Sequence, residues 1–109
     1  MKSTFLATLV LTMAVATGFS QTTEESSVRP RDGFVPNAKT AVQIGEAVLI
    51  PVYGEKQIGS ERPFTAKLQG GVWIVAGTLN CGAPQCDGGT AVVKISKTSG
   101  QILFMTHYK

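Results

Sequence analysis

Two cysteines are the residues whose spacing most directly suggests covalent chemistry. Cys81 and Cys86 lie in a turn-rich stretch rich in glycine and proline. In an oxidising compartment, so close a pair usually forms a disulfide that pins a loop. Two alternatives stay open: a metal site, which would need more ligands than the single histidine supplies, and a redox pair, which normally has the narrower Cys-x-x-Cys spacing. We expect a structural disulfide between Cys81 and Cys86.

The acids and the histidine form no recognisable catalytic pattern. Glu46 falls on the polar stripe of a predicted helix, and His107 lies near the chain end, where a histidine is usually solvated. Asp87 follows a cysteine in a loop and suits a turn hydrogen bond better than proton transfer. The sequence has no glycine-rich phosphate loop between a strand and a helix, and no hydrolytic triad. We predict no catalytic, cofactor-binding or metal-binding residue, hence no cofactor and no enzymatic activity.

The charge of the chain is weakly basic and scattered. The 109 residues include 10 Lys and Arg against 7 Asp and Glu, for a formal net charge of +3. No run of basic residues interleaves with aromatics, so nothing favours nucleic-acid binding. A chain of this length supports a single domain.

The first twenty residues have the pattern of a secretory signal peptide. Lys2 gives a positive start, and residues 5–19 are apolar or small and uncharged. This run is shorter than the about 20 apolar residues that span a bilayer, and it fits a signal core of about 7–15 residues. Small residues favour cleavage after Ala16 or after Ser20. We expect a periplasmic or secreted protein with no stable membrane insertion after cleavage.

The chain therefore divides into three parts. Residues 1–20 are the signal peptide, and residues 21–33 are polar, without periodicity, and predict a flexible lead-in. Residues 34–109 carry the apolar patterns and predict one α+β domain.

The domain begins with a helix and continues with strands. Apolar residues recur at three- and four-residue steps from Asn37, a suitable N-cap, to Gly54, a suitable C-terminal cap beyond Pro51. Gly45 is expected to let a strand approach this helix closely. Alternating patterns then predict four strands, over residues 64–69, 72–79, 90–96 and 101–108. Because the connections are short, we predict one N-terminal helix packed on a curved four-stranded antiparallel sheet.

The last predicted strand is apolar on both faces. One helix covers only one face of a sheet, so some residues of the run 102–105 must be exposed, covered by the lead-in or buried by another molecule. Aromatic residues dominate interface hot spots, which makes Tyr53 and Trp73 further candidates. Packing in the core would account for these two aromatic residues equally well. The predicted partner-binding residues are Tyr53, Trp73, Phe104 and Met105.

Several stretches resemble a bacterial family of immunity proteins with the nuclear-transport-factor-2 fold. The likeness covers about residues 35–107, and its more distinctive parts are Tyr53-Gly54 and the strand Gly71-Val72-Trp73-Ile74-Val75. The resemblance implies a cone-like member of the cystatin-like superfold, in which a curved antiparallel sheet cups a helix. It also implies a protein partner, the cognate toxin.

The function implied by this resemblance is that of an immunity protein, which neutralises a bacterial toxin by protein–protein interaction. The signal-like start of the chain adds that this member is exported, so its toxin would have to act or arrive in the envelope. Two alternatives stay open. One is a small-ligand-binding or cryptic enzymatic member of the fold, since enzymes of the broader fold often use an acid and a histidine inside the cone. The other is an envelope inhibitor resembling PepSY domains, whose strand–turn–strand ending is similar to residues 93–100. A homodimer is also open.

Overall fold

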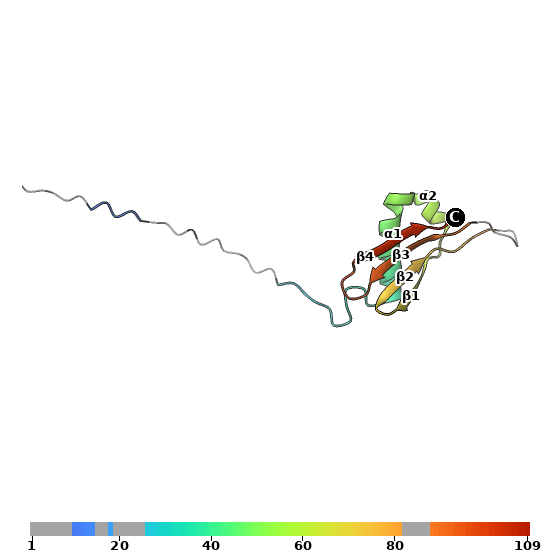
Figure 1. Cartoon of the computed structure of the whole chain (residues 1–109), viewed down its shortest axis with the longest axis horizontal. Helices are drawn as coiled ribbons and strands as arrows, with labels where there is room; N and C mark the ends of the chain where they lie inside the picture. The colour runs from blue at the N-terminus through green and yellow to red at the C-terminus, as the bar shows by residue number, and fades with distance from the viewer. Residues whose placement is uncertain (1–9, 15–17, 19–25, 82–87) are drawn as a thin grey trace, which may run out of the picture.

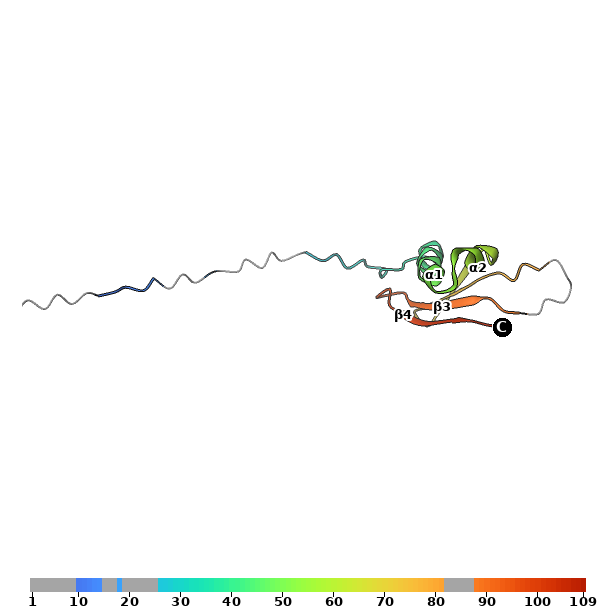
Figure 2. The ribbon, with the colours of Figure 1, turned by 90° about the horizontal axis from the view of Figure 1, so that it is seen from above.

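Two helices lie on one face of a four-stranded antiparallel sheet. The structure is a computed structural model that describes residues 10–14, 18, 26–81 and 88–109. The sheet is a meander with strand order β1-β2-β3-β4, and both helices lie on the same side of it (Figures 1 and 2). The elements are α1 (Ala38–Tyr53), α2 (Glu55–Ser60), β1 (Thr65–Gln69), β2 (Val72–Ala76), β3 (Ala91–Ser96) and β4 (Ile102–His107). This arrangement confirms the predicted α+β class and sheet.

Helix α1 begins and ends where its capping residues predict. The Asn37 side chain accepts a hydrogen bond of 2.8 Å from the Thr40 amide. At the other end, Gly54 has a φ of 89° and donates its amide to the Ile50 carbonyl at 2.7 Å. Pro51 lies inside the last turn, and the helix continues past it to Tyr53. Glycine is therefore the residue that ends α1, because side chains disfavour this positive φ.

The structure adds a short second helix, α2, that the sequence pattern does not predict. It has six residues, of which only Ile58 is buried. Six residues span less than two turns, so no apolar periodicity can develop. Strand β2 also ends at Ala76 rather than at residue 79. Two residues on, the Thr78 amide leaves the sheet pattern and donates to the Glu61 carbonyl at 2.7 Å, just after α2.

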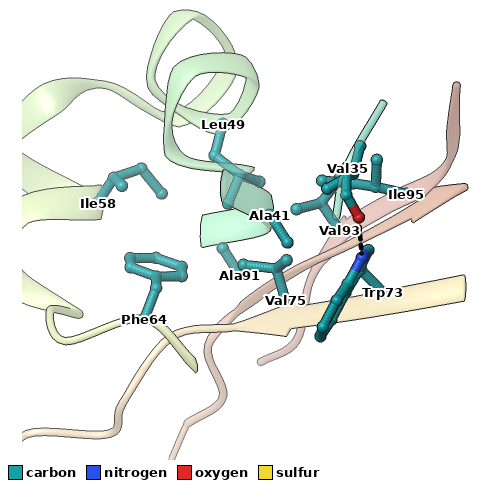
Figure 3. Packing of buried hydrophobic residues seen from close by; sticks show 10 residues of the cluster. All are labelled: Val35, Ala41, Leu49, Ile58, Phe64, Trp73, Val75, Ala91, Val93 and Ile95. Atoms are coloured by element: carbon teal, nitrogen blue, oxygen red, sulfur yellow. Dashed lines mark hydrogen bonds between the residues drawn. The ribbon is translucent and has the colours of Figure 1, made fainter. Parts of the chain in front are cut away.

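Helix α1 packs directly on the centre of the sheet because Gly45 has no side chain. A Cβ at this position would lie 2.8 Å from Val75 Cγ1 and 3.0 Å from Val93 Cγ1, which confirms the expected close approach. Leu49 from the helix and Ile95 from β3 are fully buried beside this contact (Figure 3). Side chains therefore fill the space between α1 and the sheet. The complete buried cluster is Val35, Ala41, Leu49, Ile58, Phe64, Trp73, Val75, Ala91, Val93 and Ile95.

Trp73 ties the start of the folded domain to the sheet. Its indole Nε1 donates a 2.8 Å hydrogen bond to the buried Val35 carbonyl (Figure 3). The Val35 amide in turn donates to the Lys97 carbonyl at 3.0 Å, and the Phe34 amide to the Thr98 carbonyl at 3.1 Å. These bonds dock the chain before α1 against the turn between β3 and β4.

Trp73→Phe is expected to lower the free energy of unfolding by about 2 kcal/mol, because it leaves the buried Val35 carbonyl unpaired and removes packed volume. Urea unfolding followed by far-ultraviolet circular dichroism measures this loss. The control is Phe104→Tyr on an exposed side chain, with an expected change below about 0.5 kcal/mol. Equal stability of Trp73→Phe and the wild type would show that this bond does not hold the domain start.

Candidate interaction surface

The sheet has a second face, away from the helices, which we call the outer face. Trp73, Val75, Val93 and Ile95 point toward α1 and are buried, so their neighbours along each strand point the other way. Both helices lie on the opposite side of the sheet from this face (Figure 2). The outer face is formed by Thr65, Lys67, Gln69, Val72, Ile74, Ala76, Val92, Lys94, Ser96, Phe104 and Thr106.

A single cross-strand row runs through the middle of the outer face. The strand register pairs Lys67 with Ile74, Ile74 with Lys94, and Lys94 with Phe104. The Lys94 ammonium lies 5.2 Å from the centre of the Phe104 ring, a cation–π distance. The row therefore alternates a lysine with a large apolar side chain across all four strands.

Apolar residues surround this row without a covering element. Val72, Ala76 and Val92 flank it and are only partly buried, while 43% of Phe104 is exposed. Beside the face, Leu103 is 48% exposed at the irregularity in the pairing of β3 with β4. Exposed apolar side chains grouped on one face are typical of protein–protein contact sites. The arrangement suits contact with the surface of a partner protein.

The four predicted partner-binding residues fall in different places. Trp73 is 8% exposed and belongs to the core, and Met105 is half-buried and packs against the core cluster. Tyr53 is half-buried, with its ring centre 5.5 Å from that of His107. Phe104 alone of the four combines an outer-face position with large exposure. The structure places it in one row with Ile74 and Lys94, which are absent from the predicted partner-binding residues. The signal for Ile74 in the sequence was the apolar pattern on both faces of β2.

A second feature, also missed from the sequence, is a polar cluster around Glu61. This carboxylate is 5% exposed. Its Oε1 accepts the Ala91 amide at 2.6 Å, and its Oε2 accepts the Gln57 side-chain amide at 3.0 Å. His107 Nε2 lies 3.0 Å from the same Oε2, so His107 is partly buried and paired rather than solvated. The cluster joins α2, the start of β3 and the end of β4.

Burial and hydrogen bonding act on the Glu61 carboxyl in opposite directions. Burial by itself would raise the pKa of Glu61, but the hydrogen bonds from Gln57, the Ala91 amide and His107 outweigh it and lower the pKa below its ordinary value. The carboxyl is therefore ionised at neutral pH. Both oxygens already accept protein donors and the group is nearly sealed from solvent, which favours a structural role over proton transfer to a substrate.

An exposed ion-pair network joins the two helices. Arg62 Nε lies 2.9 Å from Glu46 Oε1, and Arg62 Nη2 lies 3.1 Å from Glu55 Oε1. Glu46 is thus paired rather than simply solvated. Exposed pairs of this kind contribute little to stability.

A shallow groove of about 500 Å³ opens between α1 and the edge strand β1. Its lining mixes aliphatic and aromatic side chains with the polar side chains of Lys39, Gln43 and Thr65, which are exposed. Such a lining lacks the buried polar groups that orient a small ligand. The groove is lined by Ala38, Lys39, Val42, Gln43, Phe64, Thr65 and Ala66.

The cysteine pair stays a prediction. Cys86 and Asp87 lie outside the described residues, and Cys81 stands at the edge of the described part. Within residues 10–14, 18, 26–81 and 88–109, no group of three or more His, Cys, Asp and Glu side chains could hold a metal ion. A search of the same described residues finds no helix with the length and apolar character needed to cross a membrane.

Comparison with protein families identifies the domain. The family model of the NTF2 fold immunity proteins matches residues 40–109, which is more than half of the chain. Comparisons with curated proteins and with solved structures found no match. The matched region contains most of α1, all of α2 and the whole sheet with its outer face. The helix-on-meander fold and this match agree: the chain belongs to the NTF2 fold immunity protein family.

Proposed function

We propose that this protein is an exported immunity protein that binds a cognate bacterial toxin and silences it by covering part of its surface. The family membership supports a role in toxin immunity. The observation that carries the binding mode is the outer face, where Ile74 and Phe104 lie in one cross-strand row without a helix over them. Apolar residues at the centre of a flat surface are typical anchors of protein interfaces.

The packing of the domain favours binding over small-molecule chemistry. Leu49, Val75 and Val93 fill the space between α1 and the sheet, where a member of the fold with an internal site would need a cavity. Glu61 and His107 are engaged with each other and with neighbouring donors. The sheet of four consecutive strands also speaks against a PepSY-like module, in which a single strand pair would pack on one helix.

Export would place the encounter with the toxin in the cell envelope or outside the cell. The signal-like pattern of residues 1–20 supports this location, and so does the close pair Cys81 and Cys86, which suits an oxidising compartment. The toxin would then have to act in, or pass through, the same compartment.

Survival of toxin-exposed cells tests the proposal. Candidate toxins from genes that neighbour the gene of this chain are tested one at a time. Each is directed to the envelope of sensitive cells that carry the full chain, a chain beginning at Gln21, or no immunity gene. We expect the full chain to protect and the chain beginning at Gln21 to fail, because it stays in the cytoplasm. Protection by both chains would show that immunity does not depend on export, and recovery of the full chain in the cytoplasmic fraction alone would refute export. Protection by neither would refute the immunity function.

A further inference from the structure

The charged side chains of the outer face all have the same sign, whereas the helix side carries both acids and bases. The outer face carries two charged residues, Lys67 and Lys94, and both are basic. The described carboxylates lie elsewhere: one in the lead-in, one on each helix and one in the buried cluster after α2. These carboxylates are Asp32, Glu46, Glu55 and Glu61. Within the described part of the chain, the outer face therefore has positive charge and no acid to balance it.

From this division we infer that the outer face binds an acidic, flat surface of the toxin, whose carboxylates pair with Lys67 and Lys94 around apolar contacts to Ile74 and Phe104. The inference rests on the proposed function and names the chemistry of the partner. Opposite charges across an interface guide association and fix the register of the two surfaces.

The position of Lys94 makes a carboxylate on the partner necessary. Lys94 lies in the inner strand β3, half-buried between Ile74 and Phe104, with its ammonium against the Phe104 ring. A partner that covers the apolar residues must also take this ammonium out of water. An ammonium that loses water without gaining an anion is strongly destabilised, so an uncharged partner surface would bind poorly.

The sheet geometry also sets the spacing of the partner's acids. Lys67 and Lys94 belong to the same cross-strand row and are separated by the single strand β2. Neighbouring strands lie about 4.8 Å apart, so the two lysine backbones are about 10 Å apart. We therefore expect two acidic positions on the toxin at a similar separation, with apolar surface between them.

A second copy of the chain is a poor occupant of this face. A face-to-face pair would bring the lysines of both copies together with no carboxylate between them. The four strands, five to six residues long, define a planar area of about 300 Å². A standard stable interface buries about 800 Å² on each partner, so any partner protein, toxin or second copy, would also have to contact residues around this face. The unbalanced lysines are what disfavour the second copy.

Membranes and nucleic acids are also disfavoured by the number of charges. Anionic lipid surfaces are typically bound through about four to eight clustered Lys or Arg residues, and nucleic acids through several phosphate contacts. Lys67 and Lys94 provide two positive charges, set among apolar residues and hydroxyl groups. This composition suits a protein surface with a few well-placed acids.

Charge reversal on each side of the domain tests the inference. Isothermal titration calorimetry with the toxin against which the full chain protects cells compares the exported wild type with Lys67→Glu/Lys94→Glu. We expect binding at least about 100-fold weaker for this double variant, because both ion pairs become repulsive. The matched control is Lys39→Glu/Lys56→Glu on the two helices, with an affinity within about threefold of the wild type. Circular dichroism verifies that both variants fold.

Further outcomes separate this inference from the proposed function. Wild-type affinity for the toxin should fall as salt rises, and the exported protein should sediment as a monomer. Tight toxin binding by the outer-face variant would overturn the inference and leave the immunity function standing, whereas no toxin binding by the wild type would overturn the function itself. A wild-type dimer that Lys94→Glu dissociates would assign the face to a second copy of the chain. Sedimentation of the wild type with phosphatidylglycerol vesicles would assign it to a membrane.

Discussion

Replacing Glu61 by alanine is expected to lower the free energy of unfolding by about 3 kcal/mol. The Glu61 carboxylate is buried and accepts hydrogen bonds from the Ala91 amide and the Gln57 side chain, and it lies 3.0 Å from His107 Nε2. Alanine would leave the buried amide without an acceptor and His107 without its partner. The start of β3 and the end of β4 would lose their shared link to α2.

Urea unfolding of the variant at neutral pH measures this effect. The control is Glu55→Ala, which removes a carboxylate from the exposed pair with Arg62 and should cost less than about 0.5 kcal/mol. If the two alanine variants lost equal stability, the Glu61 cluster would not be the link described here.

The same cluster predicts a dependence of stability on pH. Hydrogen bonds hold the pKa of Glu61 below its ordinary value in the folded protein, despite burial, so folding favours the ionised form. The stabilisation is fully present above the pKa of an unfolded glutamate, about 4.3, and is lost as the pH falls through the lower folded-state value. Between pH 5 and pH 3, the wild type should therefore lose more stability than Glu61→Gln, which has no carboxyl to protonate. Parallel pH profiles would contradict this account.

The second large effect is expected at Gly45. Gly45→Leu should cost about 3 kcal/mol or more, because even a Cβ would lie 2.8 Å from Val75 Cγ1 and 3.0 Å from Val93 Cγ1. Valine side chains are stiff and cannot swing away, so α1 would have to lift off the sheet.

Thermal and urea unfolding compare this variant with Gly59→Ala in α2. There the nearest atom to an added Cβ is the flexible Arg62 Nη1 at 3.4 Å, so we expect no loss and a gain of up to about 1 kcal/mol from helix propensity. Wild-type stability of Gly45→Leu would mean that α1 does not rest on the centre of the sheet.

Much of the fold could be predicted because its signals are local. Asn37 and Gly54 mark the ends of α1 through their own capping chemistry, and the alternation along β3 shows which residues face the helix. Short connections left the meander as the simplest topology, and the structure confirms it. Gly45 could be interpreted correctly because a glycine inside a helix has a cost that only a close contact offsets.

The parts that were missed depend on contacts between distant residues. Glu61 and His107 are 46 positions apart, and their pairing exists only once the end of β4 lies beside the residue that follows α2. Helix α2 is too short to show apolar periodicity, so the sequence pattern could not predict that Ile58, its buried residue, would face the core. Tertiary contacts, rather than the secondary-structure propensity of the local sequence, determine the structure of this region.

The candidate surface could be predicted in part. The apolar run in β4 indicated that one helix could not cover all of residues 102–105, and the structure shows Leu103 and Phe104 as the exposed ones. Trp73 was ambiguous between anchor and core, and its hydrogen bond to Val35 shows the core role. The cross-strand row could not be predicted, because it depends on the register in which neighbouring strands pair, and the pattern of a single strand does not determine that register. The row consists of Lys67, Ile74, Lys94 and Phe104.

Side-chain footprinting of the toxin complex tests the central claim most directly. Hydroxyl radicals oxidise exposed aromatic rings, and the domain offers a matched pair: Phe104, 43% exposed on the outer face, and Phe34, 52% exposed where the chain enters the domain. We predict that saturating toxin protects Phe104 from oxidation and leaves Phe34 as reactive as in the free protein. Protection of Phe34 with Phe104 still fully reactive would show that the toxin binds elsewhere and that the outer face is not the immunity surface.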